Sequence, residues 1–230
     1  MRAVGIILAG GDSSKLQELT YRRAVAAMPI AGSYRSIDFA LSNMANSHVN
    51  KVAVLTQYNS RSLNEHLNSS KWWDFGRKQG GLYVFPPTIT KENGDWYRGT
   101  ADAIYQNLDF LKRCHEPYVI ITSGDAVYKL DYSKVLEYHM DTKADITVVC
   151  KEMESDTDFS RFGTVKVDDE MRIVEFEEKT SSPSSHLIST GIYIIRRRML
   201  IDLIEQSAVE KKYDFVRDIL IRYKNLKRIC

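Results

Sequence analysis

Apolar residues fall in short, nearly continuous runs that alternate with longer stretches of helical pattern. Such runs are typical of strands covered on both faces of a sheet. The predicted strands are 3–8, 51–56, 118–122 and 144–149, and the predicted helices are 37–47, 63–68, 101–113 and 132–141. We expect Thr100 to cap the helix that follows it, because its hydroxyl can accept from a free first-turn N–H. The alternation predicts βαβ units and a mostly parallel central sheet.

The pattern changes after Lys151. The elements predicted there are strands at 164–167, 173–176 and 192–195 and helices at 198–206 and 215–223. The strands are separated by loops, which predicts an antiparallel or mixed edge of the sheet, and the polar stretch 180–185 predicts a loop. Without an internal repeat or a linker, residues 1–230 form one predicted α/β domain, a doubly wound, mixed and mostly parallel sheet.

Composition limits which binding partners and which cellular location we expect. A chain of 230 residues with 43% hydrophobic content can bury a sizeable core. Its 32 basic and 30 acidic residues nearly cancel, so nucleic acid and membrane partners are not expected. The apolar run 3–9 is too short for a signal peptide or a membrane span and leads into glycines. Three widely spaced cysteines predict reduced thiols, and the expected location is cytoplasmic.

The segment after the first predicted strand is rich in glycine. Leu8 and Ala9 are followed by Gly10 and Gly11, which let backbone N–H groups approach phosphate oxygens closely. Ligands of open α/β sheets also bind at the carboxyl ends of the strands. Two glycines alone are compatible with an ordinary tight turn, and the segment is neither GxGxxG nor a Walker loop. The interpretation as a nucleotide-binding loop therefore depends on the motifs that follow it.

Several further motifs follow this loop in a fixed order. They are Gly32-Ser33-Tyr34-Arg35-Ser36-Ile37-Asp38-Phe39, Trp96-Tyr97-Arg98-Gly99-Thr100-Ala101-Asp102-Ala103, Ser123-Gly124-Asp125, Arg161-Phe162-Gly163, Glu175-Phe176-Glu177-Glu178-Lys179 and Ser189-Thr190-Gly191-Ile192-Tyr193. Together with the Gly-rich loop they resemble the bacterial glucose-1-phosphate adenylyltransferases, which make ADP-glucose for glycogen. The motifs lie in the order of that family from residue 3 to about residue 200, so the resemblance is specific.

The resemblance implies a sugar-nucleotidyltransferase fold of the Rossmann-like type and a set of site residues. The implied substrates are ATP and glucose 1-phosphate, or ADP-glucose in reverse, and the implied cofactor is Mg²⁺. Asp125 would hold the metal and, with Lys15, take part in catalysis. The implied nucleotide-binding residues are Leu8, Ala9, Gly10, Gly11, Gly99 and Thr100. The implied sugar-phosphate-binding residues are Tyr97, Gly163, Glu178, Lys179 and Ser189.

Some positions depart from the family's pattern, and they cluster where the reaction depends on charge. Lys15 stands where the family has arginine, Asp12 lies near the expected triphosphate, and Val25 replaces a lysine. The family's Gly-Asp-His reads Gly124-Asp125-Ala126, and Glu-Lys-Pro ends in Thr180. Removing one preorganised donor typically costs a factor of about 10² to 10³ in rate. The changes resemble the regulatory paralogue that assembles with a catalytic subunit, so low activity alone is expected.

Two other interpretations stay open. The chain could be a fully catalytic sugar-phosphate nucleotidyltransferase, or a non-catalytic sensor of nucleotide or sugar phosphate. An NAD-dependent oxidoreductase is disfavoured because no GxGxxG follows the first strand. The family's second metal-binding aspartate and C-terminal β-helix do not occur before Cys230, so we expect the sequence to be a truncated or incomplete form.

Overall fold

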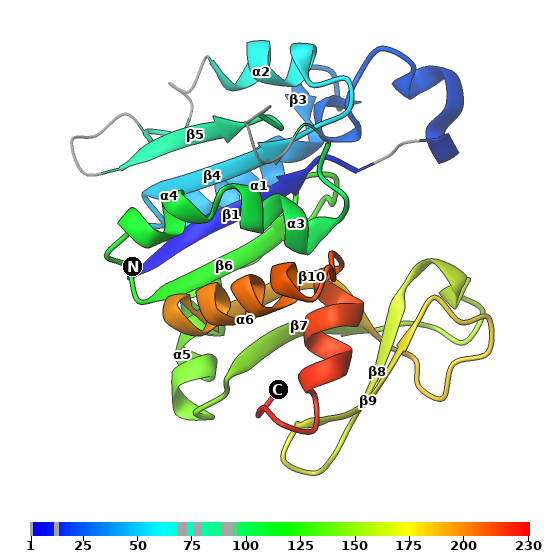
Figure 1. Ribbon diagram of the computed structural model, residues 1–230. Coiled ribbons are helices and arrows are strands. Elements are labelled where there is room, and N and C mark those ends of the chain that lie inside the picture. Colours follow the sequence, from blue (N-terminus) through cyan, green and yellow to red (C-terminus); the bar gives the residue numbers. More distant parts are fainter. Residues whose placement is uncertain (1, 12–13, 69–72, 76–79, 89–93, 95) are drawn as a thin grey trace.

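The computed structural model describes residues 2–11, 14–68, 73–75, 80–88, 94 and 96–230. Its centre is a mixed sheet with the strand order β5-β4-β1-β6-β10-β8-β9, and β7 pairs with β10 (Figure 1). The strands are β1 (Ala3–Ala9), β4 (Lys51–Thr56), β5 (Gly81–Phe85), β6 (Tyr118–Ser123), β7 (Ile146–Glu152), β8 (Gly163–Val167), β9 (Ile173–Glu178) and β10 (Leu187–Arg196). A short hairpin, β2 (Pro29–Ile30) and β3 (Tyr34–Arg35), lies outside this sheet.

The sheet has a parallel half and an antiparallel half. Strand β1 runs parallel to β4 and β6, and β4 runs parallel to β5. Strand β10 is antiparallel to β6, β7 and β8, and β8 is antiparallel to β9. The fold is therefore α/β with a mixed sheet, as the sequence predicts, but the sheet is partly rather than mostly parallel. Strand β10 joins the two halves.

Helices cover both faces of the sheet. The helices are α1 (Ser36–Asn46), α2 (Arg61–Leu67), α3 (Thr100–Gln106), α4 (Leu108–Arg113), α5 (Tyr132–Asp141) and α6 (Arg197–Val209). Short 3-10 turns lie at η1 (Ser14–Thr20), η2 (Val25–Ala27) and η4 (Phe159–Arg161), and η5 (Val216–Ile221) is a π-helix. In Figure 1, α3, α4 and α6 lie on the near face of the sheet, and α1 and α5 lie behind it. This is the doubly wound arrangement.

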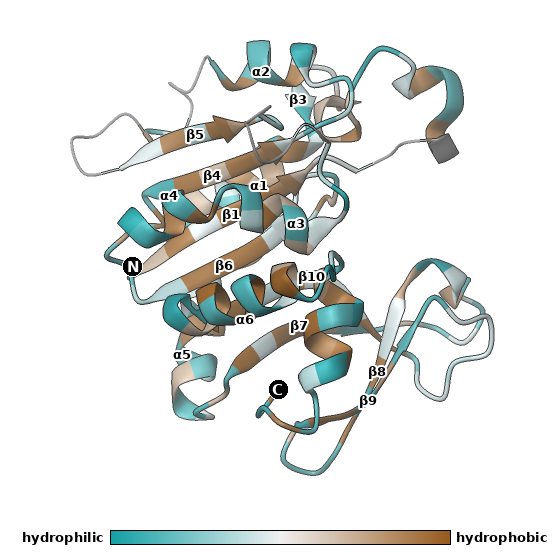
Figure 2. Cartoon of the chain, viewed as in Figure 1, coloured by the Kyte–Doolittle hydropathy of each residue, from teal (hydrophilic) through white to brown (hydrophobic). Residues whose placement is uncertain are grey.

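Each face has its own hydrophobic core, because side chains alternate along a strand. Along β1, Val4 and Ile6 pack into the core under α3, α4 and α6, whereas Ile7 packs into the core with α1, α2 and α5. All three side chains are at most 2% exposed. Figure 2 shows the strands as mainly hydrophobic ribbons between amphipathic helices. Burial on both faces explains why the strands of the parallel half are nearly continuous apolar runs.

The structure corrects several details of the predicted elements. The helix predicted over 101–113 is two helices, because Asn107 ends α3 and its amide donates to the carbonyl of Ala103 at 2.9 Å. Strand β5 was not predicted, and the strand predicted from residue 144 begins at Ile146. The Thr100 cap is also wrong: Gly99 is the N-cap residue, and no side chain caps α3.

The cysteines and the helix lengths bear on two further predictions, of unpaired thiols and of no membrane span. Cys114, Cys150 and Cys230 are all free, with two buried and one half-buried, so none of them is paired in a disulfide. Among the helices of the described ranges, none is both long and apolar enough to cross a bilayer.

Candidate active site

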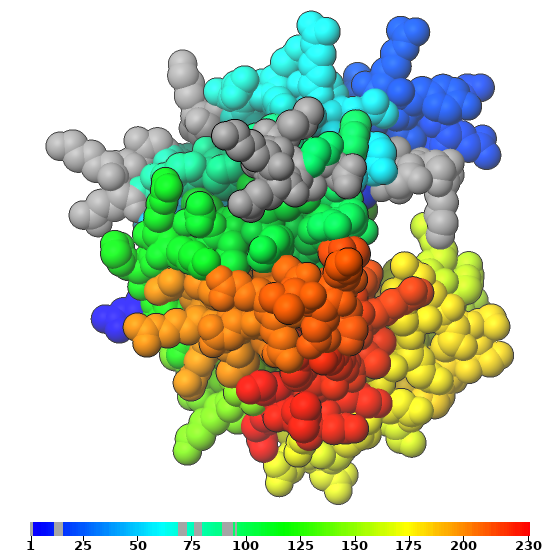
Figure 3. Space-filling model, viewed as in Figure 1, coloured from blue at the N-terminus to red at the C-terminus, as the bar shows by residue number. Residues whose placement is uncertain are grey.

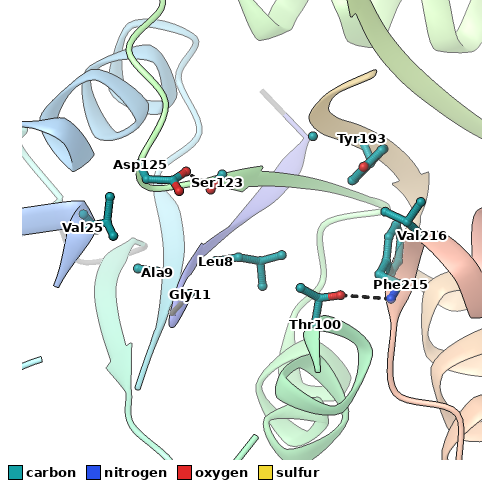
Figure 4. Close-up of a pocket in the computed structure, with 12 residues that line it drawn as sticks. Leu8, Ala9, Gly11, Val25, Thr100, Ser123, Asp125, Tyr193, Phe215 and Val216 are labelled. Atoms are coloured by element: carbon teal, nitrogen blue, oxygen red, sulfur yellow. Dashed lines mark hydrogen bonds between the residues drawn. The ribbon is translucent and has the colours of Figure 1, made fainter. Parts of the chain in front are cut away.

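A cavity of about 250 Å³ opens at the carboxyl ends of β1 and β6. This edge is where ligands bind in open α/β sheets. Strands β1 and β6 contribute one side, and the N-terminus of α3, strand β10 and the start of η5 contribute the other (Figure 4). The lining residues are Leu8, Ala9, Gly11, Val25, Ala26, Thr100, Ser123, Asp125, Gly191, Tyr193, Phe215 and Val216.

The Gly-rich segment forms the floor of this cavity. Leu8, Ala9 and Gly11 line it, and a Cβ atom built on Gly11 would meet nothing within 4 Å. Gly10 instead packs against β4, where an added Cβ would lie 3.0 Å from the Cβ of Gln57. The backbone after β1 is therefore open to a ligand at Gly11, as the predicted nucleotide-binding role requires.

The structure does not describe two charged side chains that follow the Gly-rich segment. Asp12 lies outside the described residues. Lys15 lies in η1, but its side chain is outside the described part of the chain, so its predicted catalytic role stays a prediction. Val25, which stands where the resembling family has lysine, does line the cavity. The wall is apolar at that position.

Asp125 is the one charged side chain among the residues that line the cavity in the described structure. It is exposed, and its carboxylate accepts a hydrogen bond from the hydroxyl of Ser123. The backbone N–H of Gly124 donates to the carbonyl of Leu8 at 2.9 Å, which holds the loop against β1. A Cβ on Gly124 would lie only 3.2 Å from Cγ2 of Ile7, so glycine allows this close approach.

The loop after Asp125 is anchored by buried polar groups. The amide of Asn43 donates to the carbonyl of Tyr128 at 3.0 Å and accepts from the N–H of Leu130 at 3.2 Å. The hydroxyl of Tyr128 lies 2.6 Å from the hydroxyls of both Thr122 and Tyr132. Burial raises the pKa of Tyr128 and of Tyr132, so both phenols stay neutral and hydrogen-bonded. The carboxylate of Asp125 thus extends from a firmly held loop.

The residues predicted to bind nucleotide at α3 have partners within the protein. The N–H groups of Ala101 and Asp102 donate to the carbonyl of Tyr213 at 2.8 and 3.3 Å. The hydroxyl of Thr100 accepts from the N–H of Phe215 at 2.9 Å (Figure 4). Thr100 lines the cavity, but its hydroxyl satisfies the backbone of the C-terminal segment rather than the first turn of α3.

The contact between the Tyr213 carbonyl and the start of α3 also requires glycine at position 99. A Cβ atom on Gly99 would lie 2.4 Å from the carbonyl oxygen of Tyr213 and 2.9 Å from its carbonyl carbon. These are backbone atoms, which cannot move aside cheaply. The glycine therefore allows the C-terminal segment to reach α3. Its predicted nucleotide-binding role stays a prediction.

Strand register brings most of the predicted sugar-phosphate residues together. Gly163 on β8 pairs directly with Glu178 on β9, and a Cβ on Gly163 would lie 2.9 Å from the Oε2 atom of Glu178. The Nζ atom of Lys179 lies 3.3 Å from the Oε1 atom of Glu178. The Lys179 side chain is 59% exposed, so this pair is available to a ligand. The three residues form one small polar cluster.

Tyr193 lies between the cavity and Ser189, another predicted sugar-phosphate residue. Its ring lines the cavity, and its hydroxyl lies 3.5 Å from the hydroxyl of Ser189. Burial raises the pKa of Tyr193 to about 12, and the nearby charge of Glu178 adds to the shift. The phenol is therefore a neutral donor between the cavity and the predicted sugar pocket.

Tyr97, the remaining predicted sugar-pocket residue, lies in the core. Its hydroxyl donates to the carbonyl of Phe85 at 3.1 Å and accepts from the amide of Asn107 at 2.8 Å. Its N–H donates to the Oε1 atom of Gln57 at 2.7 Å. Burial is the largest cause of its raised pKa. The structure does not bring Tyr97 to the residues that line the cavity.

The cavity also contains residues that the sequence did not identify. Ser123, Gly191 and Tyr193 lie within the motifs quoted above, so the motifs could have indicated them. Gly191 has a φ of 75° at the irregularity between Ser189 and Ile192, where β10 changes its register with β7. Phe215 and Val216 carried no signal, because their place in the cavity depends on the packing of the C-terminal segment.

The metal-binding capacity of the site rests on one carboxylate. Within the described ranges, no group of three or more His, Cys, Asp or Glu side chains is placed to hold a metal ion. Mg²⁺ usually keeps several waters and binds through one or two carboxylates together with substrate phosphates. An exposed Asp125 at the edge of the cavity fits that mode of binding.

The sequence as a whole is matched by a known protein family. The model of the nucleotidyl transferase family matches residues 4–228, and the chain belongs to that family. Among individual relatives, glucose-1-phosphate adenylyltransferases of Bacillus thuringiensis (strain Al Hakam), Bacillus anthracis and Bacillus mycoides (strain KBAB4) are each 44% identical to this chain over 221 residues. The matches cover 95% of this chain but 58% of each relative. The chain thus spans little more than half the length of these relatives.

Proposed function

We propose that this chain is the nucleotidyl-transfer domain of a cytoplasmic glucose-1-phosphate adenylyltransferase subunit of the regulatory type, with low turnover of its own. In that reaction a phosphate oxygen of glucose 1-phosphate attacks the α-phosphorus of ATP, and pyrophosphate leaves to give ADP-glucose. The observation that carries the proposal is the cavity at the carboxyl ends of β1 and β6, with Asp125 at its edge and Val25 in its wall.

The apolar cavity wall at Val25 supports the proposal that turnover is low. The protein has little covalent chemistry to perform in this reaction and must instead align two anions and neutralise their charge. Asp125 is the sole charged group among the described lining residues, and no cation faces the cavity there. A missing preorganised donor costs about 10² to 10³ in rate, so phosphates bound near Val25 would react slowly.

Asp125 is the residue that would hold Mg²⁺. The metal, when bound, would neutralise charge on the phosphates. Ser123 orients the carboxylate through its hydroxyl, and the loop anchored by Asn43 keeps the backbone in place. These residues hold and direct a metal ligand without themselves moving a proton.

On the opposite side, Lys179 would pair with the phosphate of glucose 1-phosphate. The lysine is largely exposed and is joined to Glu178, whose carboxylate would accept from sugar hydroxyls. Gly163 allows the close approach of that carboxylate, because an added Cβ would lie 2.9 Å from its Oε2 atom, and Ser189 and Tyr193 supply further donors. We propose this cluster as the sugar-phosphate half of the site.

A turnover assay tests the proposal. ADP-glucose formation from ATP, glucose 1-phosphate and Mg²⁺ is measured for the chain alone and after co-expression with a catalytic paralogue. We expect slow formation by the chain alone and a change in the rate or regulation of the catalytic subunit when both are present. Turnover of the isolated chain in the usual enzymatic range, about 1 to 10³ per second, would contradict the regulatory assignment. Binding without turnover and without any effect on a partner would instead indicate a sensor.

A further inference from the structure

We infer that Thr100 is a positioning residue that acts on the sugar-phosphate half of the site through Phe215. The inference rests on the proposed function and changes the role of a residue assigned above to the nucleotide half. Thr100, Phe215 and Tyr193 all line the same cavity, and contacts between them join its two halves (Figure 4).

The first step is the attachment of the C-terminal segment to α3. The carbonyl of Tyr213 accepts from two N–H groups of α3, and the N–H of Phe215 donates to the hydroxyl of Thr100 at 2.9 Å. Because this segment both accepts from α3 and donates to Thr100, residues 213–215 are fixed against the N-terminus of α3. In the space-filling view the C-terminal part of the chain lies directly beside α6 (Figure 3). Phe215 is therefore held at the point where it enters the cavity wall.

Arg98 strengthens this attachment. Its Nη1 atom donates to the hydroxyl of Tyr213 at 2.8 Å, and its guanidinium carbon lies 4.0 Å from the centre of the Tyr213 ring. The same guanidinium forms an ion pair with Asp102 at 3.2 Å. The Asp102 side chain is 1% exposed and also accepts from the Arg98 N–H and the Gln106 amide. The charge on Arg98 is thus used within the protein.

The second step leads from Phe215 to the sugar-phosphate half. The Phe215 ring is 1% exposed and lies 5.2 Å from the ring of Tyr193, centre to centre, at an interplanar angle of 40°. Aromatic pairs at such distances interact beyond simple burial. Tyr193 then lies beside Ser189, with 3.5 Å between the hydroxyls. A shift of Phe215 therefore changes the position of the Tyr193 phenol.

The backbone after Phe215 also favours a positional role. Residues Val216–Ile221 form a π-helix, a wide turn that is often found at functional sites. Ile219 and Leu220 in this turn are at most 1% exposed, so the segment is anchored in the core from its other end. Phe215 and Val216 are consequently fixed from both sides, and Thr100 supplies the hydrogen bond on the side of the cavity.

The test replaces Thr100 by valine, which keeps the shape but removes the acceptor, and by serine, which keeps the acceptor. Calorimetric titration of the chain with glucose 1-phosphate, in the absence of nucleotide, measures the sugar-phosphate half alone. We expect Thr100→Val to weaken glucose 1-phosphate binding by up to about tenfold, because the worth of the lost hydrogen bond limits what can be transmitted to the ligand. Thr100→Ser should keep the affinity within about twofold of wild type, because its hydroxyl still accepts from Phe215. Amide hydrogen exchange at Phe215 should be faster in Thr100→Val only.

The outcomes separate this inference from its alternatives. If Thr100 contacts nucleotide directly, Thr100→Val weakens ATP binding but leaves glucose 1-phosphate binding unchanged, and the inference is overturned. Thr142→Val, at the C-terminus of α5, makes the same chemical change away from the cavity and should leave both affinities unchanged. If Thr100→Val does not fold, Phe215→Leu decides, since it removes the ring contact with Tyr193 and should weaken glucose 1-phosphate binding similarly. A wild-type chain that binds neither ligand contradicts the proposed function itself.

Discussion

The two halves of the sheet contribute to the candidate site in different ways. The parallel half provides a backbone cradle after β1, an exposed Asp125 and an apolar wall that includes Val25. The antiparallel half provides a polar cluster in which Glu178 and Lys179 are paired beside Gly163. The side proposed for the sugar phosphate therefore has a cation, whereas the described lining of the nucleotide side has none.

Binding geometry in this fold is set independently of the charges that a phosphate-transfer reaction needs. The Gly124 loop, the Asn43 anchor and the α3 contact are all formed, and none of them depends on a cation at Val25. Packing and backbone hydrogen bonds set these positions, whereas phosphate chemistry depends on local charge. Substitutions in one half at a time therefore test whether the two halves differ in this way.

The largest effect is expected from restoring a cation to the parallel half. Val25→Lys places an ammonium group at the half-buried cavity wall, where it can neutralise phosphate charge. We expect ADP-glucose formation to rise about 10²-fold, the worth of one preorganised donor. Steady-state turnover with ATP, glucose 1-phosphate and Mg²⁺ checks this. Val25→Met, of similar length but uncharged, should give no gain; an equal gain in both variants would show that charge is not the cause.

A second prediction concerns acid stability in the antiparallel half. His139 on α5 bonds to Thr147 of β7 at 2.8 Å, and burial, with a contribution from Arg196, lowers its pKa from 6.5 to about 4. The unfolded chain therefore binds more protons than the folded chain between these values, and the free energy of unfolding falls as pH falls through that window. The expected loss is about 3 kcal/mol in all.

Urea unfolding at several pH values between 4 and 7 measures this loss, with the variants compared to wild type. His139→Gln should remove this part of the pH dependence, whereas His115→Gln, at an exposed position, should keep it. If the free energy of unfolding depends on pH in the same way in wild type and in His139→Gln, the buried histidine is not the acid-sensitive group.

The third prediction removes the cation of the antiparallel half. Lys179→Met should weaken glucose 1-phosphate binding about tenfold, because a charge-assisted hydrogen bond to phosphate is lost. Calorimetric titration measures the affinity. Lys166→Met, a change at an exposed position of β8 in the same hairpin, serves as the matched control and should bind like wild type. A loss of the same size in both variants would point to general charge attraction instead.

The smallest effect is expected at Gly163. An alanine Cβ there would lie 2.8 Å from Cε1 of Phe176 and 2.9 Å from Oε2 of Glu178, so Glu178 must shift. We expect Gly163→Ala to lower the free energy of unfolding by roughly 1 kcal/mol and to weaken sugar-phosphate binding roughly fivefold. Urea unfolding and titration measure both. Gly94→Ala, where an added Cβ meets nothing within 4 Å, should change neither; unchanged binding in Gly163→Ala would argue that Glu178 does not contact the sugar.

The central strands were more predictable from the sequence than the break between α3 and α4 or the edge strand β5. The apolar runs of β1, β4 and β6 are buried on both faces, and such burial produces a pattern that can be read directly. The break at Asn107 and the edge strand β5 have no comparable pattern. The break depends on hydrogen bonds to Ala103 and to the distant Tyr97.

The candidate site was predictable where it follows a motif and not where it depends on tertiary contact. Asp125 lines the cavity, and Gly163, Glu178 and Lys179 meet through strand register. Phe215 lies 115 positions from Thr100, and the hydrogen bond between them has no sequence signature. The expected cap at Thr100 failed for the same reason, since a distant N–H takes the hydroxyl.

A pair of titrations of the wild-type chain, one with glucose 1-phosphate and one with ATP and Mg²⁺, tests the difference between the two halves most simply. We predict that glucose 1-phosphate binds the side that has a cation. We also predict that ATP binds at least about tenfold more weakly, equivalent to the loss of one charged contact. ATP binding as tight as that of glucose 1-phosphate would contradict the proposal that the nucleotide side of this site lacks the charges needed for transfer.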